Sequence, residues 1–455
     1  MAARQAGHKE RSVSVNDTPD RALAELIEWV RIPSHAGNAD AKAEAARYCG
    51  ALLEAAGFTV KFDGPANAPA VIAVLNSEAP NRLLLYSHYD VVAPGDPAAW
   101  DHLPFSGKVV DGTLHGRGTS DHKATFIARL EAIRRLQSEN AMPLGISFLV
   151  EGEEEQGSAS LEGIITRNRD MLRAGGGLYS GGARTESGRP VIRAGCKGRI
   201  GLKLTVTLSL HDNHSKWAGL VQNAAWRLIA ALATLYDGKR GQVLVEGYRD
   251  ACDGPNAVDE AALGKLDFDA DAFLDSSGYE GLRGDIVADP LRTLMFEPTF
   301  NLAWLRSGPG GETVLPGNAS AMLDLRLVPG QNPAQVEQMI RTHLANAGFA
   351  DVEIEASGGC EPDKCELGDP VVQSLHDAAL RVHGECFLHP IGAGSGPRYL
   401  FRRHLGFNLV QDPGCSWAGS NDHAANENIR IAHFQQNISL MQEFLRVHAS
   451  RAGLS

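Results

Sequence analysis

The chain has 455 residues, of which 43% are hydrophobic and 22% are charged, so it is long enough for two or three globular domains. Its 43 Lys and Arg against 55 Asp and Glu give a formal net charge of -12, and no basic cluster is present to follow a phosphate backbone. This balance excludes nucleic acid as an expected partner. No apolar run approaches the ~18 residues that a membrane span requires.

The seven cysteines are scattered along the chain, and none has the C-x-x-C spacing of a structural zinc site. An odd number of isolated thiols is also atypical of a disulfide scaffold. The opening segment, MAARQAGHKERSVSVNDTPDR, carries charges where a signal peptide has an apolar stretch. We therefore expect a cytoplasmic protein with neither a membrane nor a nucleic-acid partner.

Helical and strand patterns alternate through the first part of the chain. Residues 1–16 form a polar leader that we expect to be disordered. The spacing of apolar residues then predicts helices over about 20–31, 41–56 and 123–137 and strands over 70–75, 83–86 and 145–150. This alternation is typical of an α/β fold in which helices surround a mainly parallel mixed sheet.

From Arg199 the pattern changes to alternating apolar residues, followed by a predicted helix over 219–235 and a late strand over 321–328. These elements predict an inserted α+β domain with a core of its own. Residues 356–370 are rich in Gly, Pro and charge, as a linker would be. We therefore predict a catalytic domain formed by 17–197 and 357–455, interrupted by a smaller domain, 198–356.

A His-x-Asp triplet ends the apolar run LLLYSHYD. His88 and Asp90 are two residues apart on a strand, so their side chains leave on the same face. This geometry suits an imidazole that binds a metal and a carboxylate that orients it. A solvated loop is the alternative interpretation, because such a triplet also arises by chance.

The segment GRGTSDHK, residues 116–123, is a glycine-containing turn that delivers Asp121 just before a predicted helix. An aspartate in that position is a candidate metal ligand. It is also a common helix N-cap, and the motif alone does not distinguish the two roles.

Three adjacent carboxylates, in EGEEEQGS at 151–158, follow a predicted strand. Adjacent acids repel each other unless they face solvent or a cation. Because neighbouring side chains diverge, one of these carboxylates can bind a metal while the next stays free to act as a general base. An acidic surface turn is the alternative.

A fourth candidate, His423, lies in the Gly- and Ser-rich loop NDHAANE near the C-terminus. Alone it means little among 16 histidines. Together with His88, Asp121 and one of these glutamates it completes a mixed nitrogen and oxygen donor set, which suits Zn, Mn or Co rather than Ca or Mg.

With these motifs in order, the chain resembles the metallopeptidase family that includes acetylornithine deacetylase, succinyl-diaminopimelate desuccinylase, glutamate carboxypeptidase and the carnosinase-like dipeptidases. The resemblance runs from WVRIPS at 29–34 to HAANENI at 423–429. It implies a zinc-peptidase catalytic domain with an inserted lid or dimerisation domain. It also implies these roles: metal ligands His88, Glu155 and His423, bridging ligand Asp121, orienting partner Asp90 and general base Glu154.

The inserted domain carries further similar segments. His214, in HSKWAG, matches a histidine that reaches the active site of a neighbouring subunit and stabilises the oxyanion there, so the resemblance implies a homodimer or larger homo-oligomer. Arg326, Thr313 and the pair Gly394 and Ser395 lie where carnosinase-like members hold the substrate carboxylate. A planar, bidentate Arg suits that role.

The chain also departs from the family pattern. A gap-free comparison places Gly181 where the ion beside His88 has an Asp ligand, and the usual Asp-Asp-Lys-Gly reads Asp121-His122-Lys-Ala. The family's Arg-Gly after the third strand is likewise Lys-Gly at 197–198. The ion beside His88 would then keep two protein ligands, so we expect one divalent ion per subunit. Glu186 is a candidate substitute ligand.

The resemblance implies metal-assisted hydrolysis of a C–N bond in a small carboxylate-bearing substrate. Because a ligand is absent at Gly181, a substrate whose own groups complete the metal coordination would suit this site. The sequence is compatible with such a member of the family, the 5-nitroanthranilic acid aminohydrolase. We therefore predict conversion of 5-nitroanthranilate into 5-nitrosalicylate and ammonia. The alternatives are a dipeptidase or N-acyl-amino-acid deacylase and, more remotely, a metal-free binding protein.

Overall fold

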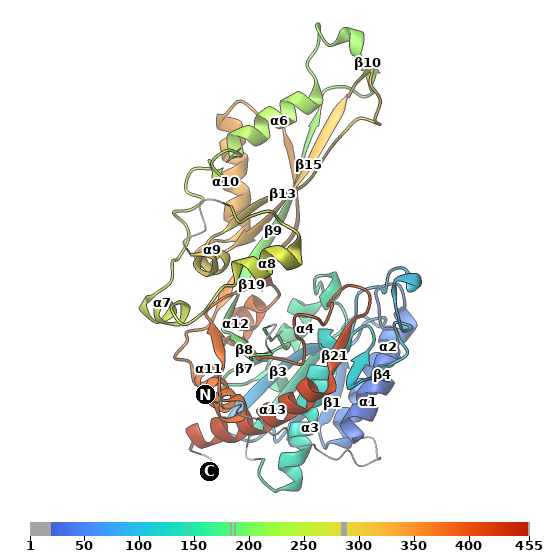
Figure 1. The fold of residues 1–455 in the computed structure, drawn as a ribbon, viewed down its shortest axis with the longest axis vertical. Coiled ribbons are helices and arrows are strands. Elements are labelled where there is room, and N and C mark those ends of the chain that lie inside the picture. Colours follow the sequence, from blue (N-terminus) through green and yellow to red (C-terminus); the bar gives the residue numbers. More distant parts are fainter. Residues whose placement is uncertain (1–19, 143, 183, 186–187, 284–288, 454–455) are drawn as a thin grey trace, which may run out of the picture.

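The structure is a computed structural model that describes residues 20–142, 144–182, 184–185, 188–283 and 289–453. The leader predicted to be disordered, 1–16, lies outside the described residues. Two parts follow each other along the long axis of the molecule: a helix-covered sheet and, above it in Figure 1, a slimmer part of strands and helices. In the part of the chain that the structure describes, no helix has the length and apolar character needed to cross a membrane.

The lower part is built on an eight-stranded sheet in the order β1-β2-β6-β3-β7-β20-β8-β18. β3 runs parallel to both β6 and β7, whereas β2 is antiparallel to β6. The mixed sheet predicted from the sequence is therefore present. The strands are β1 (Thr59–Asp63), β2 (Ala70–Leu75), β3 (Arg82–His88), β6 (Gly145–Glu151), β7 (Gly177–Tyr179), β8 (Val191–Arg193), β18 (Phe387–His389) and β20 (Leu409–Gln411).

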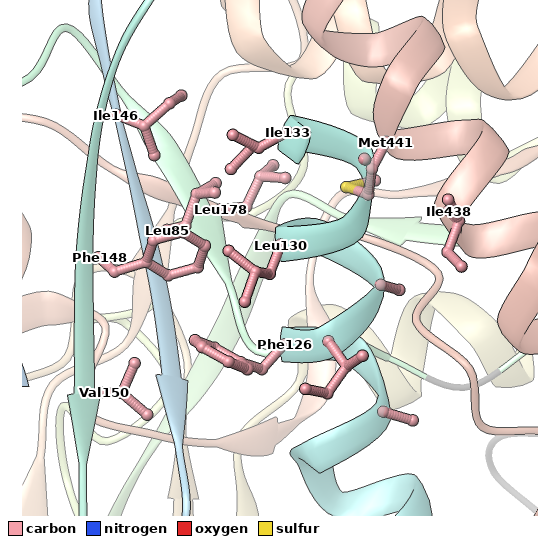
Figure 2. Packing of buried hydrophobic residues seen from close by; sticks show 14 of the residues in the cluster. Leu85, Phe126, Leu130, Ile133, Ile146, Phe148, Val150, Leu178, Ile438 and Met441 are labelled. Atoms are coloured by element: carbon pink, nitrogen blue, oxygen red, sulfur yellow. The ribbon is translucent and has the colours of Figure 1, made fainter. Parts of the chain in front are cut away.

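Helices cover both faces of this sheet, because its central strands are apolar on both sides. On one face α3 lies between the sheet and α13, so that Phe126 and Leu130 meet Phe148 of the sheet (Figure 2). The helices on this face are α1 (Arg21–Val30), α2 (Ala39–Ala55), α3 (Ala124–Ser138), α11 (Pro370–His383) and α13 (Ile431–Arg451). The other face is covered by α4 (Leu161–Arg167), α5 (Arg169–Leu172) and α12 (Tyr399–Leu405).

The upper part has a second sheet, in the order β13-β15-β9-β16, and a separate core drawn from residues 200–354. Its strands are β9 (Gly195–Thr207), β13 (Thr299–Ser307), β15 (Asn318–Leu327) and β16 (Glu353–Cys360), with the short pairs β10 (Asn213–His214) and β14 (Val314–Leu315), and β11 (Tyr236–Asp237) and β12 (Gln242–Val243). Its helices are α6 (Ala224–Leu235), α7 (Ala257–Leu263), α8 (Ala270–Ser277), α9 (Pro290–Phe296) and α10 (Pro333–Asn346).

Two predicted boundaries differ from the structure. The helix predicted from 219 begins at Ala224, because the Asn223 side chain accepts hydrogen bonds from the next turn and caps it there. The predicted linker 356–370 begins as the end of β16 and continues as β17 (Asp363–Lys364), which pairs with β9. Glycine and charge are tolerated there because β16 is an edge strand.

Candidate metal centre and active site

Two neighbouring parallel strands deliver the first site residues to one edge of the large sheet. His88 ends β3 and is in register with Glu151, which ends β6. The turn after β6 carries Glu154 and Glu155. Asp90 joins the two strand ends, because its carboxylate accepts hydrogen bonds from the backbone N of Glu154 (3.2 Å) and Glu155 (3.1 Å). Its Oδ1 also lies 3.5 Å from Nδ1 of His88, as expected for an orienting partner.

A small three-stranded sheet brings the other two motifs together. It is formed by β4 (Lys108–Val110), β5 (Thr113–His115) and β21 (Asn428–Arg430). Because β5 pairs antiparallel with β21, the segment that follows β5 lies beside the loop that precedes β21. Asp121 and His423, far apart in the sequence, therefore meet.

A buried ion pair holds these two segments in place. Glu427 Oε2 accepts from Nη1 of Arg117 at 2.6 Å, and its Oε1 accepts from the backbone N of Ser120 at 3.0 Å and of Asp121 at 3.2 Å. Sequence reasoning missed both Arg117 and Glu427, because single charged residues usually lie on the surface. The sequence did contain a signal for this pair: Arg117 and Glu427 each lie inside a motif already singled out, and they carry opposite charges.

Asp121 lies between two groups of donors. Its Oδ1 is 3.1 Å from Nε2 of His88 and 2.8 Å from Nε2 of His122. Its Oδ2 is 2.8 Å from Nε2 of His423, which is 3.3 Å from Oε2 of Glu155. In each group the candidate ligand atoms lie within 4.8 Å of one another. All four ligands predicted from the sequence therefore come together, and His122 joins them.

The electrostatics of this cluster suit a cation. Burial alone would raise the pKa of Asp121, but the imidazoles of His122, His423 and His88 hold that pKa well below its usual range. Hydrogen bonds to Asp121 and Glu155 raise the pKa of His423 to about 10. Imidazole nitrogens and carboxylate oxygens that converge in this way fit a divalent transition metal such as Zn, Mn or Co.

Glu154 belongs to neither donor group among the described residues. Burial raises the pKa of Glu154, and the nearby His88 opposes that shift. Its Oε1 accepts a hydrogen bond from the hydroxyl of Tyr179 at 3.2 Å. A carboxylate beside the ligands but separate from them has the position of a general base. Sequence reasoning missed Tyr179, which ends the three-residue strand β7 and belongs to no motif.

Gly181 lies where the chain leaves no room for a side chain. A Cβ there would be 2.5 Å from Oγ1 of Thr125 and 2.8 Å from Cα of Gly414. The structure also places His122 with His88 and Asp121 as a third candidate donor, which the expectation of two protein ligands for the ion beside His88 did not include. Sequence analysis noted His122 only as a departure and gave it no role. Glu186, the candidate substitute, lies outside the described residues.

The donor cluster is formed by His88, Asp121, His122, Glu155 and His423, and a pocket of about 270 Å³ opens beside it. Three of the four predicted substrate-binding residues, Arg326, Gly394 and Ser395, meet at the edge of this pocket. His122, Gly394 and Ser395 line it. Ser395 Oγ accepts a hydrogen bond from Nη1 of Arg326 at 2.9 Å. Arg193, missed by sequence reasoning, also lines the pocket, and burial lowers its pKa to about 10. The pocket therefore joins the metal ligands to positive groups that suit a carboxylate.

His214 and Thr313 do not join the cluster within one chain. β10, which contains His214, pairs with β14 near the far end of the upper part (Figure 1). Ser215 donates a backbone hydrogen bond to the carbonyl of Thr313 at 2.9 Å, so the two predicted residues share this tip. Both side chains are exposed. A role for either one in catalysis requires a second subunit.

Comparison with known proteins gives consistent matches. The model of peptidase family M20/M25/M40 matches residues 84–447. The cysteinylglycine-S-conjugate dipeptidase of Corynebacterium striatum is 29% identical over 454 residues, 95% of this chain and 97% of that protein. The β-Ala-His dipeptidase of Rattus norvegicus is 28% identical over 286 residues, 61% of this chain and 58% of that protein. The M20 family metallo-carboxypeptidase Sso-CP2 of Sulfolobus solfataricus is similar in structure, with a TM-score of 0.88 and 33% identity over 94% of this chain and 99% of that one.

The fold and its donor cluster define a metal-dependent hydrolase of C–N bonds. The chain belongs to peptidase family M20/M25/M40, which confirms the family resemblance and the predicted fold class. The prediction of a divalent metal cofactor is confirmed with it, and the donor cluster is where the chain would hold that metal.

Proposed function

We propose that the protein is a dipeptidase that cleaves short peptides with a free terminal carboxylate. The observation that carries this proposal is the shared pocket: His122 of the donor cluster and Ser395, the partner of Arg326, line one cavity. A pocket that joins candidate metal ligands to a guanidinium suits a substrate whose scissile amide lies beside a carboxylate.

The relatives favour this alternative over the predicted 5-nitroanthranilate aminohydrolase. The proteins compared above are named as dipeptidases and a carboxypeptidase. For a dipeptide these two activities coincide, since removing the C-terminal residue cleaves its only peptide bond. The aminohydrolase prediction relied on a substrate that fills the position left by Gly181, and His122 now supplies a donor beside it.

Each residue of the proposed site has a distinct role in the hydrolysis. The donor cluster would hold a divalent ion, whose Lewis acidity would acidify water and polarise the substrate carbonyl. Glu154 takes the proton from the attacking water and passes it to the departing amino group. Asp90 holds the turn that carries Glu154, and Tyr179 orients the Glu154 carboxylate. Arg326 and Ser395 anchor the substrate carboxylate.

We also propose the division into a catalytic domain, 17–197 and 357–455, and an inserted lid or dimerisation domain, 198–356. The separate core of the upper part supports it. Exposed apolar side chains on that part support a homodimer, including Trp226 on α6 (69% exposed) and Leu302 on the edge strand β13 (46% exposed). In such a dimer His214 of the partner subunit would complete the active site.

A substrate panel tests the proposed activity. Protein loaded with Co²⁺ or Mn²⁺ is incubated with cysteinylglycine, β-alanylhistidine, their C-terminal amides, an N-acetyl amino acid and 5-nitroanthranilate. We expect hydrolysis of the free dipeptides and little hydrolysis of the amides, because the amides lack the anchoring carboxylate. Release of 5-nitrosalicylate without peptide turnover would support the aminohydrolase instead. Turnover of the acetylated substrate alone would support the deacylase.

A further inference from the structure

We propose that His122 is a metal ligand that replaces the carboxylate absent at Gly181, so that the chain binds two ions rather than one. This inference rests on the metal dependence of the family and not on the choice of a peptide substrate. The two ions would share Asp121. One would be held by His88, Asp121 and His122, and the other by Asp121, Glu155 and His423.

The geometry of the first group carries the proposal. Nε2 of His88 and Nε2 of His122 approach the same oxygen, Oδ1 of Asp121, at 3.1 Å and 2.8 Å. The two rings meet edge to face, 5.1 Å between centroids, so both nitrogens converge on one point without the rings overlapping. His88 is 2% exposed and His122 is partly buried. Three lone-pair donors at one partly buried point form a transition-metal site.

The packing at Gly181 gives an independent reason. Thr125 and Gly414 occupy the space that a side chain at 181 would need, so a carboxylate cannot return there by a single substitution. The replacement donor therefore has to come from another segment. His122 is next to the bridging ligand in the sequence, and it lines the pocket beside Gly181.

Replacing the carboxylate absent at Gly181 with His122 would change the net charge of the metal centre. A carboxylate ligand brings a negative charge, whereas a metal-bound imidazole is neutral. Two divalent ions would then be balanced by two ligand carboxylates, Asp121 and Glu155, where the arrangement implied by the family resemblance has three. The remaining positive charge would strengthen attraction to anionic groups in the pocket. Nδ1 of His122 has no hydrogen-bond partner among the described residues, so this ring lacks the outer support that Asp90 gives His88.

Metal counting tests the proposal directly. The purified chain is stripped with a chelator, reloaded with Co²⁺, passed through gel filtration and analysed by elemental mass spectrometry. We expect two ions per chain in the unmodified protein and one in His122→Ala. His423→Ala should also retain one ion, because it disables the other group. His115→Ala is the matched control from the same segment and should retain two.

Two further measurements keep the result decisive. His122→Gln has nearly the same side-chain volume and replaces His122→Ala if that variant does not fold, as judged by circular dichroism. X-ray absorption of the unmodified, zinc-loaded protein counts imidazole ligands: we expect three shared by two ions. Two imidazoles, two ions retained in the His122 variants, or one ion in the unmodified protein would overturn the proposal. None of these readouts depends on a substrate, so failure of the dipeptidase proposal would be seen separately.

Discussion

The donor cluster and the tip of the upper part are opposite kinds of functional region. At the cluster, Asp90, Asp121 and Glu427 are each fixed by several hydrogen bonds from neighbouring segments of the same chain. At the tip, His214 and Thr313 are exposed, and β10 and β14 pair over only two residues. One chain therefore brings the donor cluster together by itself, whereas the predicted role of the tip depends on a second copy.

The largest expected effect lies at the cluster. Glu154→Gln should reduce kcat by ~10²–10⁴-fold because it removes the general base, while metal content stays unchanged. Steady-state kinetics on a dipeptide and elemental analysis measure the two quantities. Loss of metal in this variant would show that Glu154 is a ligand, and unchanged kcat would remove its catalytic role.

The second prediction tests whether the tip acts across subunits. His214→Ala should reduce kcat by ~10²–10³-fold through loss of an oxyanion donor, again without loss of metal. Mixing this variant with Glu154→Gln should restore activity that neither has alone, because a mixed dimer contains one complete site. No recovery after subunit exchange, verified by native mass spectrometry, would contradict the shared site.

Arg326 links the upper part to the pocket, since it lies on β15 and contacts Ser395 there. Arg326→Ala should raise KM for a dipeptide by about 10- to 100-fold, with a smaller change in kcat, because a charged hydrogen bond contributes about 1.5–3 kcal/mol. Arg199→Ala is the matched control: it also removes an ion pair with Asp324 but leaves Ser395 untouched. An equal rise in KM in both variants would indicate a structural role instead.

The smallest effect concerns acid stability, and it should be confined to the lower part. Burial and the nearby Arg184 lower the pKa of both His383 and His433 to about 4. The unfolded chain, with histidine pKa values near 6.5, binds more protons between these values, so stability present above pH ~6.5 is lost as the pH falls towards 4.

Replacing one of these histidines should reveal that contribution. His433→Gln should reduce the pH dependence of the unfolding free energy by at most ~1.4 kcal/mol per pH unit. Urea unfolding between pH 4 and pH 7 measures it. His211→Gln, at an exposed position of the upper part, is the control and should leave the slope unchanged. Equal slopes in both variants would show that the buried histidine does not titrate as expected.

The predictable part of the site consists of residues at strand ends and turns. His88, Glu155 and His423 follow apolar runs or lie in glycine-rich loops, where local sequence already indicates an accessible polar side chain. Large-sheet strands such as β2 were predictable for a related reason, because long apolar runs allow few other environments. Local patterns therefore located both the sheet and its functional edge.

The unpredicted residues owe their roles to contacts between distant segments. Glu427 matters because β5 pairs with β21, and Tyr179 because β7 lies beside the turn after β6. His122 needed knowledge of where its ring points, which the spacing along the sequence does not contain. The edge strand β16 looked like a linker for the same reason, since its pairing with β9 brings together residues far apart in the chain.

The close crossing at Gly181 limits which substitutions this part of the chain can accept. Gly414 is as constrained as Gly181, because a Cβ on it would lie 2.5 Å from the carbonyl oxygen of Gly182. Because the two segments cross so closely, a carboxylate at position 181 would have to displace a backbone as well as Thr125. Position 181 therefore accepts a side chain less readily than position 122, whose residue lines the pocket. Under the proposed two-ion arrangement, related chains with the same pair of glycines are expected to carry a metal-binding side chain at position 122.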